Sequence, residues 1–214
     1  MREEIIKKIE KEKIIAIIRG VNEEKLIPLV QALYDGGIKL IEVTFGKDSD
    51  EKTAENIRIL VENFGGKMYI GAGTVLTEKQ VELTAKAGGK FIISPDVYDK
   101  VIRKTVESGM VSMPGAFSPT EIRTALRAGA DFVKIFPTSV VGAKYIKAIK
   151  APLSDVKLLA VGGVNLENMA EFFSAGVCGF GIGANIIDKK MLEKEDFAGI
   201  TELAKKYVQI AKTL

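Results

Sequence analysis

The chain has 214 residues, is 47% hydrophobic and 28% charged, and carries a net charge of +3, which is ordinary for a globular protein with a large core. The charge is small and dispersed, which argues against nucleic acid and anionic membranes as partners. Because the chain contains no histidine, Ser-His-Asp and Cys-His hydrolases and histidine-ligated zinc enzymes are excluded, so any chemistry must use lysine, carboxylates, tyrosine and bound water.

The N-terminal segment mixes acids with isoleucines and predicts an amphipathic helix over about residues 2–12, not a signal or transit peptide. No apolar run approaches the roughly 20 residues of a membrane-spanning helix. The single cysteine, Cys178, is expected to be an inert core residue. Together these features predict a cytoplasmic protein with no membrane partner.

Strand-like runs recur at a nearly regular spacing along the rest of the chain, with segments of helical periodicity between them. The runs cover residues 14–19, 40–44, 69–72, 91–94, 111–114, 132–136, 157–161 and 179–183. Continuously apolar strands that alternate with helices predict a parallel sheet covered on both faces. Eight such units predict a (β/α)8 TIM barrel with an extra N-terminal helix, as one domain over residues 1–214. An open doubly wound sheet is the alternative, but no GxGxxG motif follows the first strand.

Helix boundaries are marked by capping residues. Thr77 and Ser118 precede helical runs, with Gln80 and Glu121 three residues later. Glycines that suit the left-handed position after a helix follow several of these runs, namely Gly36, Gly88, Gly109, Gly129 and Gly176. The run 196–212 predicts a single C-terminal helix.

A lysine lies in the middle of the sixth predicted strand, Phe132–Phe136, which Pro137 ends. Lysines are rarely buried unless they are paired or used. Desolvation lowers the pKa of a lysine, so Lys134 has the character of an amine that attacks a ketone and forms a Schiff base. The alternative is a lysine at a strand end whose ammonium group reaches water.

A carboxylate occupies the equivalent place in the second predicted strand, where Glu42 is the one charged residue among apolar neighbours. Burial raises the pKa of such a group, as suits a general acid/base at neutral pH. The alternative is a structural ion pair with Arg19 or Lys134. Arg19 ends the first strand, where it can clamp an anionic substrate, neutralise Glu42, or do both.

Glycine-rich segments follow three of the predicted strands. The run Gly71–Thr74 is a weak signal for a small-ligand site, because a tight turn explains its glycines equally well. Gly162-Gly163 and the run Gly181–Asn185 follow the seventh and eighth strands. In (β/α)8 barrels the loops after these two strands often bind phosphate, although close packing at the barrel rim is the alternative.

These segments, in order from about residue 14 to 190, resemble the 2-keto-3-deoxy-6-phosphogluconate / 4-hydroxy-2-oxoglutarate aldolase family. The motifs that carry the resemblance are Ile17-Ile18-Arg19, Ile41-Glu42-Val43-Thr44, Gly71-Ala72-Gly73-Thr74-Val75, Ile93-Ser94-Pro95, Met113-Pro114-Gly115, Lys134-Ile135-Phe136-Pro137 and Gly162-Gly163-Val164. The resemblance implies a homotrimeric class I aldolase without metal or cofactor. Its substrate would be a small 2-keto acid.

The resemblance also implies a role for each site residue. Lys134 would form the Schiff base, and Glu42 would move protons during imine formation and carbon–carbon cleavage. The remaining positions would bind substrate: Arg19 and Thr74 its carboxylate, Pro95 and Phe136 the region around the imine, and Gly162, Gly163, Gly183 and Ala184 its phosphate.

Three positions depart from the common family pattern. Gly46, followed by Lys47, replaces a frequent arginine; Ala160-Val161 replaces Pro-Thr before the double glycine; and Ala184 replaces the last serine of the phosphate loop. The Ala-Val-Gly-Gly variant is similar to the 2-keto-3-deoxy-6-phosphogalactonate aldolase branch. These changes leave the reaction in place and leave the preferred substrate open.

The expected reaction is cleavage of 2-keto-3-deoxy-6-phosphogluconate, and/or 4-hydroxy-2-oxoglutarate, to pyruvate and an aldehyde, either glyceraldehyde 3-phosphate or glyoxylate. The alternative substrate is 2-keto-3-deoxy-6-phosphogalactonate. Two more remote alternatives are a phosphosugar isomerase or epimerase, which would never release pyruvate, and an inactive barrel that binds a metabolite as a sensor.

Overall fold

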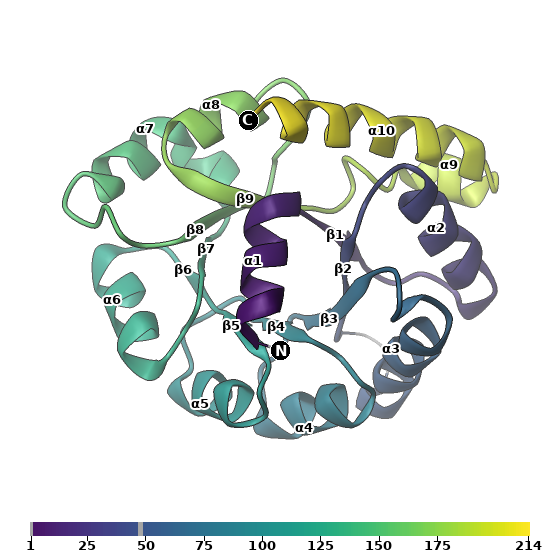
Figure 1. Cartoon of the computed structure of the whole chain (residues 1–214), viewed down its shortest axis with the longest axis horizontal. Coiled ribbons are helices and arrows are strands. Elements are labelled where there is room, and N and C mark those ends of the chain that lie inside the picture. The colour runs from purple at the N-terminus through teal and green to yellow at the C-terminus, as the bar shows by residue number, and fades with distance from the viewer. Residues whose placement is uncertain (1, 47–48) are drawn as a thin grey trace.

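The computed structural model describes residues 2–46 and 49–214, and it confirms the predicted alternation of parallel strands and helices (Figure 1). The strands are β1 (Ile14–Ile18), β2 (Leu40–Thr44), β3 (Tyr69–Gly73), β4 (Phe91–Ile93), β5 (Val111–Met113), β6 (Gly115–Ala116), β7 (Val133–Ile135), β8 (Leu158–Val161) and β9 (Val177–Ile182). The helices are α1 (Arg2–Glu12), α2 (Glu23–Asp35), α3 (Asp50–Phe64), α4 (Glu78–Lys86), α5 (Asp99–Glu107), α6 (Pro119–Ala128), α7 (Thr138–Lys150), α8 (Met169–Ser174), α9 (Lys189–Glu193) and α10 (Phe197–Thr213).

The strands form one parallel sheet in the order β5-β4-β3-β2-β1-β9-β8-β7-β6. The two outermost strands, β5 and β6, are consecutive in the chain and are separated only by Pro114. One half of the segment 111–116 therefore pairs with β4 and the other half with β7. The sheet is a nearly closed, barrel-like ring with helices around its outside (Figure 1).

The expected count of eight strands is not confirmed, because the described residues form nine. The expected strand 111–114 ends at Met113, and a two-residue strand follows Pro114. The physical reason is that proline has no N–H to donate to the ladder. The Pro114 carbonyl oxygen still accepts from the Lys134 N–H at 2.9 Å, which ties this segment to β7.

Helix ends follow the predicted capping residues with one correction. Thr77 and Ser118 both form capping boxes, and Gly88, Gly109, Gly129 and Gly176 all have positive φ. The prediction for Gly36 is wrong: its φ is −74°, and Gly37 takes the left-handed conformation at φ 95°. Gly36 is needed for close packing instead, since an added Cβ would lie 2.4 Å from the Ala204 Cβ on α10.

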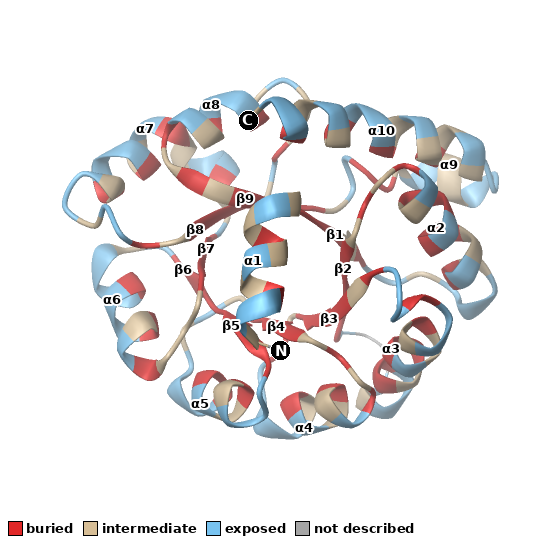
Figure 2. Ribbon diagram, viewed as in Figure 1, coloured by how far each residue is buried: buried red, intermediate tan, exposed pale blue. Residues whose placement is uncertain are grey.

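The N-terminal helix α1 lies across the ring of strands (Figure 1). A single residue, Lys13, separates it from β1, so it covers the end at which the strands begin. Its buried residues Ile5 and Ile9 pack with side chains inside the ring, including Phe91 and Phe132. The outer helices also pack through one face: Figure 2 shows that their buried residues point to the sheet. The barrel interior is thus filled at this end, so a site inside the ring is expected at the other.

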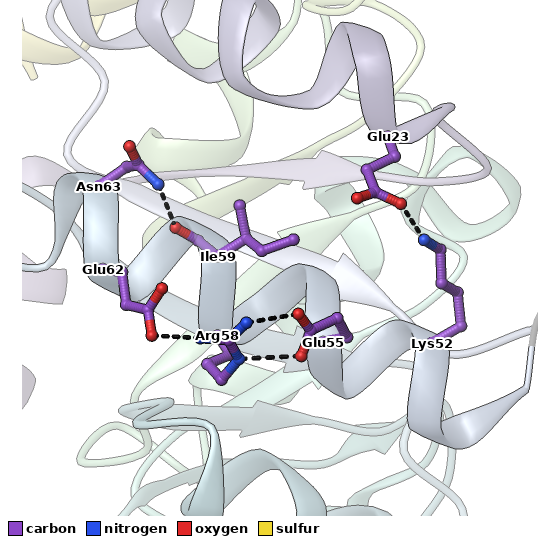
Figure 3. A network of polar contacts seen from close by, with 7 residues as sticks. All are labelled: Glu23, Lys52, Glu55, Arg58, Ile59, Glu62 and Asn63. Carbon is purple, nitrogen blue, oxygen red and sulfur yellow. Dashed lines mark hydrogen bonds and ion pairs between the residues drawn. The ribbon is translucent and has the colours of Figure 1, made fainter.

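Several ion pairs lie on the exposed surface of α3. Arg58 pairs with Glu55 and Glu62, and Lys52 pairs with Glu23 of α2 (Figure 3). Exposed pairs of this kind contribute about 0–1 kcal/mol each. Across residues 2–46 and 49–214, no helix combines the length and apolarity that crossing a bilayer requires.

Candidate active site

A cavity of about 940 Å³ opens at the ends of the strands opposite α1. Its wall is built from the residues that follow β1, β3, β4, β7, β8 and β9, with contributions from α2 and α9. All of the residues predicted to bind substrate or to react line this cavity, namely Arg19, Glu42, Thr74, Pro95, Lys134, Phe136, Gly162, Gly163, Gly183 and Ala184. The structure therefore brings together positions that are up to 165 residues apart in the chain.

Lys134 occupies the middle of β7 and is only 7% exposed. Strand pairing holds it on both sides, opposite Gly115 of β6 and Leu159 of β8. Its Nζ lies 4.8 Å from the centre of the Phe136 ring. Burial lowers the pKa of the Lys134 ammonium; Glu42 opposes this effect and Arg19 adds to it. A lowered pKa increases the share of the neutral amine, the form of lysine that can act as a nucleophile.

Glu42 lies on β2 and is 4% exposed. Burial raises its pKa to about 7, against the opposing charges of Lys134 and Arg19. In the described part of the chain its Oε2 has no hydrogen-bond partner. The alternative interpretation, a structural ion pair with Arg19 or Lys134, therefore finds no support in the geometry. A carboxyl group in a cavity with a pKa of about 7 can give or take a proton near pH 7.

Arg19 and Thr74 meet over the end of β2. Arg19 follows β1 and Thr74 follows β3, the two strands that flank the strand carrying Glu42. The Arg19 Nη2 donates to the Thr74 Oγ1 at 3.4 Å. Thr74 takes the left-handed conformation, at φ 56°, which non-glycine residues rarely adopt. This arrangement places a guanidinium and a hydroxyl beside Glu42, where they can bind a carboxylate.

The turn after β8 consists of Gly162 and Gly163, with φ of 91° and 81°. Both glycines are needed for the left-handed backbone, and an added Cβ at Gly163 would lie 2.6 Å from the Ser139 Cβ. The neighbouring loop after β9 is tied to this one, because the Asn185 Nδ2 donates to the Val164 carbonyl oxygen at 2.7 Å. The two glycine-rich loops are therefore joined to each other in the cavity wall.

The three departures from the family pattern fall in different places. Val161 and Ala184 line the cavity, so both remove a hydroxyl from its wall. Ala160 is fully buried in β8 and does not line it. Gly46 is exposed and also lies away from the cavity wall. Lys47 lies outside the described residues.

Sequence reasoning missed the outer wall of the cavity, which α2 and α9 supply. Lys25 lines it and donates through Nζ to the carbonyl oxygens of Leu192 and Glu193, each at 3.2 Å. Lys189 lines the same region from the start of α9. No local pattern marks these residues, since their helices reach the cavity only through tertiary packing. Among the described residues, no group of three or more Cys, Asp or Glu side chains is placed to hold a metal ion.

Comparison with known proteins shows which family the chain resembles. The model of the family "Aldolase: KDPG and KHG aldolase" matches residues 5–203. A 2-dehydro-3-deoxy-6-phosphogalactonate aldolase of Escherichia coli is 41% identical over 81% of this chain and 83% of its own length. A 2-dehydro-3-deoxy-phosphogluconate aldolase of Haemophilus influenzae is 30% identical over 98% of both chains.

Solved structures of related proteins have the same fold. One described as native KDPGal has a TM-score of 0.84 and 37% identity, over 94% of this chain and 96% of that one. A KDPG aldolase from Legionella pneumophila, with pyruvate captured as a covalent carbinolamine, has a TM-score of 0.84 and 29% identity, over 92% and 94%. The chain therefore belongs to the KDPG and KHG aldolase family, whose members are lyases.

Proposed function

We propose that this protein is a class I aldolase that cleaves a 2-keto-3-deoxy-6-phospho sugar acid to pyruvate and an aldehyde. The observation that carries the proposal is the pairing of Lys134 and Glu42 in one cavity. Burial shifts the pKa of both groups towards neutrality, downwards for the lysine and upwards for the carboxyl group. Such opposed shifts are typical of a nucleophile and its acid/base partner.

In the proposed reaction, the neutral Lys134 amine adds to the C2 carbonyl of the substrate, and Glu42 protonates the hydroxyl that leaves as water. Glu42, directly or through water, then removes the proton of the C4 hydroxyl. The C3–C4 bond breaks, its electron pair moves into the protonated imine, and the aldehyde leaves. The enamine takes a proton at C3, and water hydrolyses the imine to release pyruvate and the free amine.

The substrate would lie across the cavity with its two anionic ends apart. Arg19 and Thr74 would hold the carboxylate beside the imine, supported by their hydrogen bond. Pro95 and Phe136 would line the apolar wall around the reacting carbons. The backbone N–H groups of Gly162, Gly163, Gly183 and Ala184 would hold the phosphate. No step requires a metal or a cofactor.

The preferred substrate is proposed to be 2-keto-3-deoxy-6-phosphogalactonate, the alternative from the sequence. The two relatives at 41% identity both carry the name of that aldolase, whereas those named for the phosphogluconate compound are about 30% identical. The run Ala160-Val161-Gly162-Gly163, which resembles that branch of the family, supports this choice. No observation specifically favours a phosphosugar isomerase or a sensor.

The test is pyruvate release from the two substrates, which differ in configuration at C4, with pyruvate reduced by lactate dehydrogenase as the readout. We expect a higher kcat/KM for the phosphogalactonate compound. Lys134→Arg keeps the positive charge and cannot form the imine, so it should be inactive. Lys157→Arg is the matched control, since Lys157 pairs with Glu10 at the opposite end of the barrel. Turnover by Lys134→Arg would refute the mechanism.

A homotrimer is proposed as the assembly. Large apolar side chains are exposed after the ends of β3, β4 and β6 and on α7, namely Leu76, Tyr98, Phe117 and Val140; Ile27 and Phe136 are exposed as well. Exposed apolar groups that gather on one side of a protein often mark an interface. Sedimentation equilibrium should give three times the chain mass of 23.2 kDa. A monomer at micromolar concentration would contradict the proposal.

A further inference from the structure

The hydroxyl of Thr138 lies where the strand carrying Lys134 meets the glycine turn after β8. Thr138 is fully buried at the start of α7. Its Oγ1 donates to the Val161 carbonyl oxygen at 2.6 Å and accepts from the Val161 N–H at 2.7 Å, and the Ile135 carbonyl oxygen lies 3.0 Å away. One side-chain oxygen thus satisfies both backbone polar groups of the last residue of β8.

Around this hydroxyl, the segment 136–139 packs closely against the Gly162-Gly163 turn. The Ser139 N–H donates to the Gly162 carbonyl oxygen at 3.0 Å. A Cβ added at Gly162 would lie 3.3 Å from the Phe136 ring and from Pro137, and one at Gly163 would lie 2.6 Å from the Ser139 Cβ. The segment 136–139 and the Gly162-Gly163 turn therefore hold each other in place.

Lys134 and the glycine turn are anchored differently. Strand pairing fixes Lys134 on both sides, and its N–H donates to the Pro114 carbonyl oxygen. Gly162 and Gly163 lie beyond the last paired residue of β8, Val161, so the strand ladder does not hold them. Loss of the Thr138 hydroxyl should consequently move the turn and leave the lysine in place.

We infer that Thr138 is a positioning residue that sets the place of the Gly162-Gly163 turn relative to Lys134. Through the turn it favours substrates with an anionic group, such as a phosphate, at the end remote from the keto carbon. Thr138 does not line the cavity, so it acts through the backbone and touches no substrate. The inference rests on the aldolase function proposed above.

The test compares Thr138→Val and Thr138→Ser with Thr105→Val. Thr105 is a matched control because it is also fully buried and donates to a backbone carbonyl, that of Val101 at 2.7 Å, but within α5. Two activities are measured for each variant. Exchange of the pyruvate methyl protons with solvent reports on Lys134, Glu42 and the carboxylate site without involving the turn. Cleavage of substrate with and without its phosphate reports on the turn.

We expect Thr138→Val to raise the KM for the phosphorylated substrate about 10-fold or more, because small displacements of a binding group are costly. Proton exchange and cleavage of the unphosphorylated acid should stay within about twofold of wild type. Thr138→Ser keeps the hydroxyl and should restore the KM, and Thr105→Val should behave as wild type. Thr138→Cys has a weaker hydrogen-bonding group and should raise the KM severalfold, which keeps the test decisive if the valine variant does not fold.

An unchanged KM in the valine and cysteine variants, or an equal loss on both substrates, would overturn the inference while the aldolase function stands. A wild-type protein that neither exchanges pyruvate protons nor releases pyruvate would instead overturn the proposed function, and this inference with it.

Discussion

Gly73 lies directly against the carboxyl group of Glu42. A Cβ added at Gly73 would lie 2.5 Å from the Glu42 Oε1 and 2.6 Å from its carboxyl carbon. The two residues are on the paired strands β2 and β3, where Gly71 is opposite Glu42 and Gly73 is opposite Thr44. The missing side chain at Gly73 thus makes the space in which the buried carboxyl group lies.

Gly73→Ala should therefore displace the Glu42 carboxyl group. We expect kcat/KM for aldol cleavage to fall about 10²-fold, the order of loss that a displacement of about 1 Å produces. Gly66→Ala is the control, since an added Cβ there meets no atom within 4 Å, and it should keep activity within about twofold. A fully active Gly73→Ala enzyme would show that the position of Glu42 does not matter for the reaction.

The raised pKa of Glu42 makes the stability of the protein depend on pH. The pKa rises from 4.5 to about 7 on folding, so the folded state binds this proton more tightly than the unfolded state. Between these values the free energy of unfolding falls as the pH rises, by on the order of 3 kcal/mol in total. Glu42→Gln removes this cost, so it should be more stable than wild type at pH 8 by about 1–3 kcal/mol.

Urea unfolding at pH 8 and at pH 4.5 measures this effect. The advantage of Glu42→Gln should shrink towards zero at the lower pH, where the wild-type carboxyl group is protonated in the folded state. Glu167→Gln, at an exposed carboxylate, should change stability by less than about 0.5 kcal/mol at either pH. An equal gain for Glu42→Gln at both values would mean that its charge is not the cause.

Arg19 influences the titration of both reacting groups. Its charge lowers the pKa of Glu42 and also that of Lys134. Arg19→Met should therefore move both limbs of the pH profile of kcat/KM to higher pH, and it should raise the KM because the carboxylate loses its partner. Arg123→Met, on the exposed face of α6, should leave the profile unchanged. A higher KM with an unshifted profile would limit Arg19 to substrate binding.

The helix α1 should contribute strongly to stability through its buried isoleucines. Ile9 is fully buried against the side chains inside the barrel. Ile9→Ala should lower the free energy of unfolding by about 2–5 kcal/mol, from lost burial and the cavity left behind. Ile27→Ala, on the exposed side of α2, should cost about 1 kcal/mol or less. Equal costs for the two variants, measured by urea unfolding, would show that α1 is not part of the core.

Glu42 and Lys134, at the centre of the candidate site, could be identified from the sequence because short stretches of neighbouring residues mark them. Glu42 and Lys134 are each a lone charge in an apolar strand, and the alternation of strands and helices brings strand ends together. The break of the fifth strand at Pro114 was harder to predict, because the proline carbonyl still joins a ladder while its nitrogen cannot.

Other features depend on contacts between distant segments. Gly36 differs from the other helix-ending glycines because the left-handed residue is the next one, Gly37, and because α10 packs closely against Gly36. Lys25 enters the cavity wall because α9 lies beside it. From the sequence, Thr138 is an ordinary residue at the start of a helix. Only the structure shows that its hydroxyl forms hydrogen bonds with the Val161 N–H and carbonyl oxygen. No pattern in the neighbouring residues carries that information.

The measurement that tests the central claim most directly is reduction with borohydride in the presence of pyruvate, followed by peptide mapping. The account predicts one pyruvyl adduct, on the peptide that carries Lys134, and none when pyruvate or borohydride is omitted. No adduct, or adducts spread over exposed lysines, would contradict the assignment of Lys134 as the Schiff-base residue.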